Sequence, residues 1–259
     1  MGMDLSSSRA IAPHLHLLDE VGSTNAELVA RASGGGLDDF TVVVTTNQTA
    51  GRGRLDRVWV APPGRTIAVS VLLAPHGLSL EKLGWMPLLA GLAMTRAVAS
   101  LVDGHRVTLK WPNDVQVDGL KVSGLLAELL PAPIAVVVGA GLNLTMTPEE
   151  LPTSTSTSLT LVGASEVDLV DRALAAYLGR LRVLYDDYRA SGFDPEAGLR
   201  SQVTAACSTI GQSVRVELPA GGELRGVAEG IDPLGRLLVR SDGGVQPVAA
   251  GDVTHLRYE

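Results

Sequence analysis

Residues 110–124 read KWPNDVQVDGLKVSG, and this stretch organises the interpretation of the whole chain. Asp118 and Gly119 stand between two alternating runs, and both residue types tolerate the positive φ of a type I′ turn. The sequence therefore predicts a β-hairpin with a two-residue turn, which fixes the register of its strands. The cross-strand partners in that register are Val117 with Leu120, Gln116 with Lys121, Val115 with Val122, and Asp114 with Ser123.

Side chains alternate between the two faces of a hairpin, so this register sorts the residues by chemistry. One face is predicted to be apolar and to carry Val115, Val117, Leu120 and Val122. The other is predicted to be polar and to carry Asp114, Gln116, Lys121 and Ser123. Asp114 and Lys121 are diagonal neighbours, roughly 5 to 8 Å apart at the backbone, so both can reach a single ligand. A plain ion pair on a solvated face is the alternative, and the hairpin alone favours it.

The composition excludes several classes of protein. With 259 residues, of which 46% are hydrophobic, the chain can bury one large core and a small second one. The net charge of −7 argues against DNA or an anionic membrane as a partner. The longest apolar run, residues 134–142, is too short to span a bilayer. The single cysteine, Cys207, permits no intramolecular disulfide and indicates a cytoplasmic protein, and we expect this residue to be buried.

The order of the elements indicates an α+β fold. Strands are predicted at residues 14–18, 41–46, 66–73, 106–110, 114–117, 120–130 and 134–143. Helices are predicted at residues 24–33, 86–103 and 167–191, with a short one from Asp194. Because consecutive strands are joined by short turns, we expect a mostly antiparallel sheet with helices on one face.

The composition changes near residue 205. From Gly211 onward, short strands alternate with the turn sequences PAGG (219–222), DPLG (232–235) and SDGG (241–244). Such hairpins predict a small β-barrel, so we expect one domain of residues 1–204 and a second of residues 205–259. About fifty residues bury a marginal core alone, so the second domain should dock against the first.

Thr24-Asn25-Ala26-Glu27 has the pattern of a capping box at the start of the first predicted helix. Thr24 is expected to cap the N3 amide, and Glu27 to reach back to the cap. The hydroxyls of Ser23 and Thr24, with the free amides of the helix start, offer a place for polar or anionic ligand atoms. A plain helix cap is the alternative.

A glycine-arginine loop, NQTAGRGRLDR, occupies residues 47–57. Gly51 and Gly53 let the backbone approach a ligand closely. The arginines of the loop, which can fork onto a carboxylate or a phosphate, are Arg52, Arg54 and Arg57. We expect a mobile clamp that orders when an anion binds. A solvated basic loop or a finger in a DNA minor groove are the alternatives, and the acidic chain argues against DNA.

Glycines also interrupt the last strand of the main sheet. Gly139 and Gly141 cost stability there unless another group approaches the backbone closely, and a β-bulge is the alternative. Asn143 follows with an amide that can read a base or ring edge. The polar run TSTSTS at residues 153–158 is predicted to be a flexible loop.

Taken together, these motifs resemble biotin protein ligases. The motifs are Ser23-Thr24-Asn25, the loop Gln48-Thr49-Ala50-Gly51-Arg52-Gly53-Arg54 ending at Trp59, the run Lys110-Trp111-Pro112-Asn113-Asp114, Lys121 with Gly124, and Gly139-Ala140-Gly141-Leu142-Asn143. They occur in that family's order and span nearly the whole chain. The GRGR loop combined with the spacing from KWPND to Lys121 is highly specific, whereas either alone is moderately so.

The resemblance implies a central domain similar to the cores of class II aminoacyl-tRNA synthetases and lipoate ligases, with an SH3-like C-terminal barrel. It implies biotin, ATP and Mg²⁺ as ligands and biotinyl-5′-AMP as the intermediate. The implied acceptor is a lysine of the biotin carboxyl carrier domain of an acyl-CoA or pyruvate carboxylase. The ligase-only class without an N-terminal DNA-binding domain is expected, as a monomer or weak homodimer. Some members cover adenine with a tryptophan, which residues 154–159 lack.

The resemblance and the chemistry together assign roles to individual residues. The expected catalytic residues are Lys121, Arg52 and Asp114. The expected biotin-binding residues are Ser23, Thr24, Asn25, Gln48, Gly51, Arg52, Gly53, Arg54, Trp59, Lys121, Gly124 and Gly139. The expected ATP-binding residues are Arg54, Arg57, Lys110, Asn113, Gly141 and Asn143. Lys121 and Arg52 should stabilise the charge that develops when the biotin carboxylate attacks the α-phosphate, and Asp114 should orient the acceptor amine.

Two other functions stay open at this point. A lipoate protein ligase shares the core fold and runs the same adenylation on a different acid, although the GRGR loop and the C-terminal barrel favour biotin. A nucleic-acid-binding regulator that uses the arginine loop is the alternative from another class. Pyrophosphate release with biotin and with lipoate separates all three.

Overall fold

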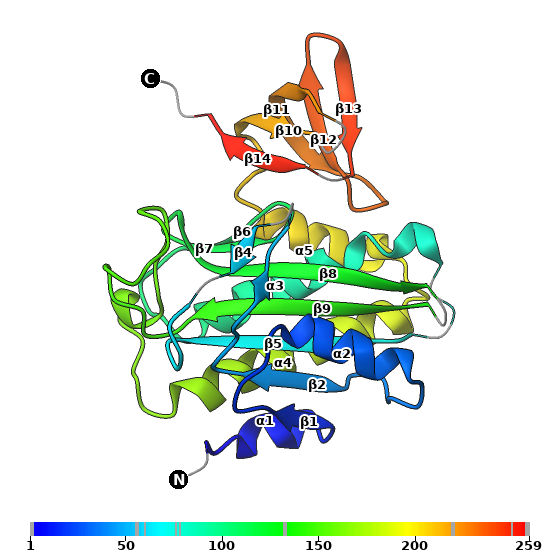
Figure 1. Cartoon of the computed structure of the whole chain (residues 1–259). Coiled ribbons are helices and arrows are strands. Elements are labelled where there is room, and N and C mark those ends of the chain that lie inside the picture. The colour runs from blue at the N-terminus through cyan, green and yellow to red at the C-terminus, as the bar shows by residue number, and fades with distance from the viewer. Residues whose placement is uncertain are drawn as a thin grey trace.

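The structure of the protein is a computed structural model, which describes residues 3–54, 57–59, 61–75, 77, 79–131, 134–218, 221–249 and 251–256. Figure 1 shows a central unit built on a broad sheet, and a smaller all-β unit formed by the C-terminal part of the chain. The α+β fold class expected from the sequence is confirmed.

Within the described residues, the central sheet has seven strands in the order β1-β2-β5-β9-β8-β7-β6. Their bounds are β1 Leu15–Leu17, β2 Val42–Thr45, β5 Thr66–Leu73, β6 Val107–Lys110, β7 Asp114–Val117, β8 Leu120–Pro131 and β9 Ile134–Asn143. Every neighbouring pair is antiparallel except β1 and β2. Short turns join the consecutive strands β6, β7, β8 and β9.

Helices cover both faces of this sheet. The described helices are α1 Ser6–Ile11, α2 Thr24–Ser33, α3 Trp85–Ala99, α4 Leu169–Ala190 and α5 Leu199–Ala206, with short 3₁₀ turns η1 Leu80–Lys82, η2 Thr160–Val162 and η3 Pro195–Ala197. Figure 1 shows α3 and α4 behind the sheet and α2 in front, where Leu28 packs with Val43, Leu72 and Val137. The prediction of helices on one face is therefore wrong. The strands β2 and β5 are buried on both sides, so each face needs a cover.

The predicted hairpin forms, with Asp118 at φ 50° and Gly119 at φ 85° in its turn. Its register is wrong beyond the second pair, because a β-bulge places Val115 opposite Ser123 and Asp114 opposite Gly124. The extra residue lets β8 bury both Val122 and Ser123. Leu120, predicted to lie on the apolar face, is 38% exposed at the hairpin tip.

The start of α2 is capped one residue earlier than predicted. Ser23 is the N-cap, and its hydroxyl accepts from the amide of Ala26. Glu27 does not return to the cap but pairs with Arg31, at 2.7 Å, one turn further along. The shift leaves Thr24 inside the helix, where its side chain is buried against the sheet.

The polar run at residues 153–158 is not a free loop. The amide of Lys121 donates to the carbonyl of Thr155, and the amide of Thr157 donates to the carbonyl of Lys121, both at 2.8 Å. Ser158 is fully buried and donates to the carbonyl of Met146. The run therefore packs against β8 beside Lys121, because backbone pairing and hydroxyl bonds satisfy its polar groups.

The C-terminal unit is an antiparallel sheet in the order β13-β12-β11-β10-β14. Its strands are β10 Ser213–Glu217, β11 Glu223–Ile231, β12 Leu237–Ser241, β13 Gly244–Val248 and β14 Asp252–His255. It docks on the central unit as predicted. The buried indoles of Trp85 and Trp111 donate to the carbonyls of Pro233 and Gly235, at 2.8 and 3.4 Å. The boundary between residues 204 and 205 stays a prediction.

Two further observations bear on the composition arguments. Cys207 is buried, as expected from the sequence, and burial raises the pKa of its thiol. Within the described part of the chain, none of the helices combines the length and the apolar character that a membrane span needs.

Candidate active site

A cavity of about 540 Å³ lies over the middle of the central sheet, between the two units. The sequence-predicted site residues that line it are Ser23, Thr24, Asn25, Gln48, Arg52, Gly53, Arg54, Arg57, Trp59, Lys110, Asn113, Asp114, Lys121, Gly124, Gly139, Gly141 and Asn143. Gly51 is not among the lining residues. The C-terminal unit adds Glu217, Val253 and Thr254. Residues more than a hundred positions apart thus meet at one place.

The glycine-arginine loop forms a two-stranded ribbon over this cavity, made of β3 Gly51–Arg52 and β4 Val58–Trp59. Gly51 pairs with Trp59, and a Cβ added at Gly51 would lie 2.5 Å from the carbonyl oxygen of Trp59. Glycine is therefore needed at this position for the ribbon to close. The mobility predicted for the loop stays a prediction.

The indole of Trp59 rests on a glycine floor. Gly124 and Gly141 are cross-strand partners on β8 and β9. A Cβ on Gly141 would lie 2.5 Å from Cε2 of Trp59, and one on Gly124 would lie 3.3 Å from Cζ3. Gly139 is explained in the same way, since its Cβ would meet Oδ1 of Asn25 at 2.2 Å. The β8–β9 register runs without a break, so the β-bulge alternative for these glycines is wrong.

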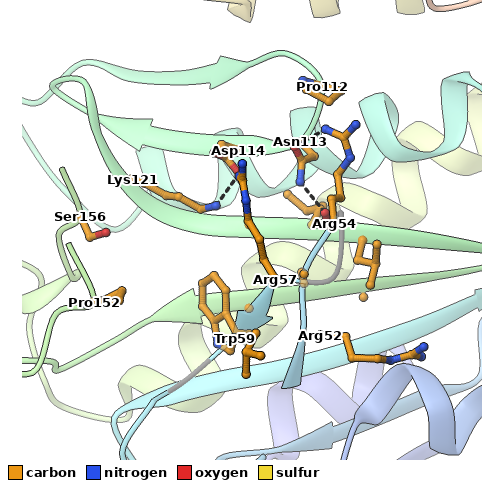
Figure 2. A pocket seen from close by; sticks show the side chains of 18 of the residues that line it. Arg52, Arg54, Arg57, Trp59, Pro112, Asn113, Asp114, Lys121, Pro152 and Ser156 are labelled. Carbon is orange, nitrogen blue, oxygen red and sulfur yellow. Dashed lines mark hydrogen bonds and ion pairs between the residues drawn. The ribbon is translucent and has the colours of Figure 1, made fainter. Parts of the chain in front are cut away.

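Lys121 and Asp114 face the cavity together, as the hairpin predicted. The Nζ atom of Lys121 lies 2.7 Å from Oδ1 of Asp114 and 5.9 Å from the ring centroid of Trp59. Figure 2 shows this ion pair above Trp59, with Arg57 extending toward it and Ser156 on the far side. The pair therefore joins the polar face of the hairpin to the ribbon.

Arg54 connects three segments at one end of the cavity. Its guanidinium donates to Oδ1 of Asn113 and to the carbonyl of Gly251, both at 3.2 Å. Asn113 in turn donates to the carbonyl of Leu125 on β8, at 2.7 Å. The ribbon, the KWPND segment and the C-terminal unit are thus held by one side chain.

Arg52 points elsewhere. Figure 2 shows its side chain directed away from Lys121 and Asp114. One of its guanidinium nitrogens lies 2.8 and 3.1 Å from the two carboxylate oxygens of Glu128 on β8. The structure therefore does not bring the two predicted catalytic cations, Lys121 and Arg52, together. Glu128 is missing from the sequence predictions, although it shares the strand face of Gly124.

A polar network lies below the ribbon at the Arg52 end. Ser70, in the middle of the buried strand β5, is fully buried. Its Oγ lies 2.6 Å from Oδ1 of Asn25 and 2.8 Å from Oγ1 of Thr24. The amide of Thr24 donates to Oε1 of Gln48 at 2.9 Å. Ser70 was not predicted from the sequence either. The signal that could have indicated it is a polar residue among the apolar residues 67–73 of the strand.

Asn143 has a different local role from the one predicted. Its buried side chain donates to the carbonyl of Thr157 at 2.9 Å. It therefore anchors the polar run at residues 153–158 to the end of β9. Asn143 lines the cavity as well, so binding of adenylate remains a prediction for it.

The charges of the cavity oppose the charge of the chain. Its lining contains five basic side chains, Arg52, Arg54, Arg57, Lys110 and Lys121, against the acidic Asp114 and Glu217. The chain as a whole has a net charge of −7. Such a local excess of cations attracts an anionic ligand. In the described part of the chain, no group of three or more His, Cys, Asp or Glu residues could hold a metal ion.

Comparisons with known proteins agree on one family. Residues 19–143 match the biotin/lipoate A/B protein ligase family, and residues 209–256 match the biotin protein ligase C-terminal domain. The chain is 40% identical over 245 residues to the biotin–[acetyl-CoA-carboxylase] ligase of Mycobacterium tuberculosis, covering 94% of this chain and 89% of that protein. It is 32% identical to the corresponding ligase of Paracoccus denitrificans, covering 92% and 98%.

A solved structure has the same architecture. The biotin protein ligase of Aquifex aeolicus in complex with biotin and ATP superposes with a TM-score of 0.76 at 26% identity, covering 94% of this chain and 99% of that one. The sequence matches extend across both units of the fold. This chain belongs to the biotin protein ligase family.

Proposed function

We propose that this biotin protein ligase carries out both of its steps in the one cavity between its two units. In the first, the biotin carboxylate attacks the α-phosphate of ATP, the bond to the β-phosphate oxygen breaks, and pyrophosphate leaves. In the second, a lysine amine of the acceptor attacks the carbonyl of biotinyl-5′-AMP, and AMP leaves. The observation that supports this best is the Lys121–Asp114 pair in a cavity where cations outnumber acids.

The biotin ring is assigned to the network end of the cavity. Ser23, Thr24 and Gln48 offer hydroxyl and amide groups there, and Trp59 covers the space next to them. We assign Asn25 a different role from the one expected from the sequence. Both hydrogens of its amide already have acceptors, the carbonyl of Leu126 and Glu128, so Asn25 supports the ring site rather than donating to biotin.

The adenylation step brings two anions together, so it depends on cations at the developing charge. Lys121 is assigned to the carboxylate and the α-phosphate. Arg54, Arg57 and Lys110 are assigned to the remaining phosphates, because they are the other basic side chains of the lining besides Arg52. Arg52 is moved from this group to the biotin end, since its guanidinium pairs with Glu128.

The transfer step needs a neutral acceptor amine near the carbonyl. Asp114 is the acidic residue beside Lys121. Carboxylates as a class are much weaker bases than the amine of a lysine. Asp114 is therefore assigned to orienting the incoming amine and stabilising its positive charge during attack.

Mg²⁺ fits the site as a companion of the nucleotide rather than as a protein-bound ion. No metal-binding group of acids, histidines or cysteines occurs among the described residues, and Asp114 is already paired. Mg²⁺ on ATP takes most of its ligands from phosphate oxygens and water. When bound, it supplies positive charge at the departing pyrophosphate.

The partners follow from the same assignment. The relatives in Mycobacterium tuberculosis and Paracoccus denitrificans are named for acetyl-CoA carboxylase, which supports a biotin carboxyl carrier domain as the acceptor. A pyruvate carboxylase carrier presents the same kind of lysine. We place the protein in the cytoplasm, where such carriers and ATP occur, as a monomer or weak homodimer.

Lipoate is the second candidate substrate, because the family model that matches residues 19–143 covers lipoate ligases as well. The match of residues 209–256 to the biotin protein ligase C-terminal domain favours biotin. The test follows pyrophosphate release with ATP and either acid, then the mass of a purified carrier domain. We expect release with biotin and a carrier heavier by one biotinyl group. Release with lipoate alone, or with neither acid, would overturn the proposal.

A further inference from the structure

Glu128 stands just behind the cavity and touches two of its walls. It lies on β8, outside the lining, with 28% of its side chain exposed. One carboxylate oxygen accepts from Nδ2 of Asn25 at 2.8 Å, and the same oxygen lies 2.8 Å from the guanidinium of Arg52. Asn25 comes from the start of α2 and Arg52 from the ribbon. One acidic side chain therefore joins the floor of the cavity to its cover.

The contact with Asn25 fixes the orientation of an amide. A carboxylate only accepts hydrogen bonds, so the nitrogen of Asn25 faces Glu128 and its oxygen faces Ser70. The second hydrogen on that nitrogen is taken by the carbonyl of Leu126, at 3.2 Å. A rotated amide would place its oxygen against two acceptors. Glu128 and Leu126 together therefore exclude the other orientation.

The fixed amide is connected to the residues assigned to the biotin ring. Ser70 touches both Asn25 and Thr24, at 2.6 and 2.8 Å. The backbone amide and the hydroxyl of Thr24 both donate to Oε1 of Gln48, at 2.9 and 3.2 Å. A change at Glu128 is thus passed through Asn25 and Ser70 to Thr24 and Gln48.

Asn25 has no room to absorb such a change. A Cβ on Gly139 would meet Oδ1 of Asn25 at 2.2 Å, so the amide lies against the bare backbone of β9. Glu128 contacts the nitrogen of the same amide at 2.8 Å. A displacement of Asn25 therefore moves the groups above it.

We propose that Glu128 is a positioning residue for biotin binding, which sets the orientation of Asn25 and holds Arg52 of the ribbon in place. It acts through these two residues and does not touch the ligand. This inference rests on the assignment of the biotin ring to Thr24 and Gln48. It predicts a selective effect on biotin, since the nucleotide phosphates are assigned to Arg54, Arg57 and Lys110, none of which Glu128 is seen to contact in the described part of the chain.

The test is Glu128→Gln, which keeps the shape of the side chain. Glutamine keeps one oxygen that can accept from Asn25, but it loses the negative charge, and its NH₂ group replaces the second oxygen, which lies 3.1 Å from the guanidinium of Arg52. A donor then faces a donor, so the hold on Arg52 is lost. We expect the Kd for biotin, measured by calorimetry without ATP, to rise on the order of tenfold. The Kd for ATP should change less than twofold.

Glu150→Gln is the matched control. Glu150 pairs with Arg65 at 3.4 Å, and 27% of its side chain is exposed, against 28% for Glu128. Neither Glu150 nor Arg65 lines the cavity. We expect both variants to lose a similar amount of thermal stability, and only Glu128→Gln to lose biotin affinity.

Ser70→Ala tests the same connection by a second route. It removes the hydroxyl between Asn25 and Thr24 and leaves Glu128 untouched. We expect a selective rise in the Kd for biotin here as well. An unchanged Kd for biotin in both variants, or a rise matched by ATP and by the control, would overturn the proposal. A wild-type protein that releases no pyrophosphate with biotin would instead overturn the proposed function.

Discussion

Replacing Lys121 by methionine should slow adenylation by about two to three orders of magnitude while leaving the fold intact. Methionine keeps the length and removes the charge. The Nζ atom lies 2.7 Å from Asp114, and 34% and 24% of the two side chains are exposed. A partly exposed pair of this kind stabilises a fold by about 1 kcal/mol or less, which corresponds to roughly 2 to 4 °C in Tm for a chain of this length. The apolar face of the hairpin, with Val115, Val117 and Val122, is untouched.

The effect on rate should be far larger than the effect on stability. Removing one preorganised charge at a developing anion costs about 2.7 to 4 kcal/mol, or 10²- to 10³-fold in rate. The variant also leaves the carboxylate of Asp114 without the ammonium of Lys121 beside it, in a cavity that must accept two anions. Two unit charges 4 Å apart repel by roughly 4 kcal/mol at most near a protein surface. The loss should therefore lie at the upper end of that range.

The double variant Lys121→Met with Asp114→Asn separates the two contributions. Removing the carboxylate of Asp114 should return roughly tenfold of the lost rate, because its repulsion of the two anions disappears while the missing cation does not return. The assay is single-turnover pyrophosphate release with saturating biotin and ATP, with thermal unfolding in parallel. A Lys121→Met variant that releases pyrophosphate within threefold of the wild-type rate would refute the assignment of Lys121.

Four other predictions test other parts of the structure. Gly139→Ala should bind biotin more than tenfold more weakly, as measured by calorimetry, and should lose about 1 to 3 kcal/mol of stability, because its Cβ meets Oδ1 of Asn25. Biotin binding at wild-type affinity would contradict this. Amides of residues 47–54 and 57–59 should exchange more slowly with biotin and ATP than without, and equal exchange would count against ordering of the loop. Truncation after Ser201 should weaken ATP binding and slow adenylation, because it removes the carbonyl of Gly251 that Arg54 contacts and the carbonyls to which Trp85 and Trp111 donate. A soluble truncated chain that fails only in transfer would instead show that the C-terminal unit serves binding of the acceptor. Burial raises the pKa of Asp171, but hydrogen bonds from Ser8 and Ser7 outweigh burial and leave the pKa below its ordinary value. The stabilisation of the fold by the ionised Asp171 is therefore present above about pH 4, and it is lost as the pH falls through the lower folded-state pKa. Asp171→Asn should therefore be less stable than wild type at pH 7, and the difference in Tm should shrink below about pH 4.

The pairing of Lys121 with Asp114 could be predicted from the sequence because it depends on local chemistry. Asp118 and Gly119 fix the turn, and strand alternation does the rest. The β-bulge was not predictable, because it depends on contacts with a distant segment of the chain. The backbone of Lys121 pairs with Thr155 and Thr157, a polar segment that composition alone describes as flexible.

The partners of the arginines could not be predicted for a different reason. Arg52 meets Glu128, which is 76 residues away, and Arg54 meets Gly251, which is 197 residues away. Neither contact follows from a period or a turn. Both depend on how the ribbon lies across β8 and on how the C-terminal unit docks. The residue types of the loop indicated an anion clamp, but the position of each guanidinium depends on the tertiary structure.

The positions at which the sequence departs from its own local rules are the ones that shape the cavity. Glycine weakens a strand, yet Gly139 and Gly141 stand inside β9, where Asn25 and Trp59 leave no space for a Cβ. A hydroxyl is costly inside an apolar strand, yet Ser70 is fully buried in β5 and satisfies two groups of the floor. Folding alone would favour an alanine or a valine at these three positions. Their cost is offset only if the space and the polar groups serve a ligand, which is why such departures mark the functional site more reliably than any single motif.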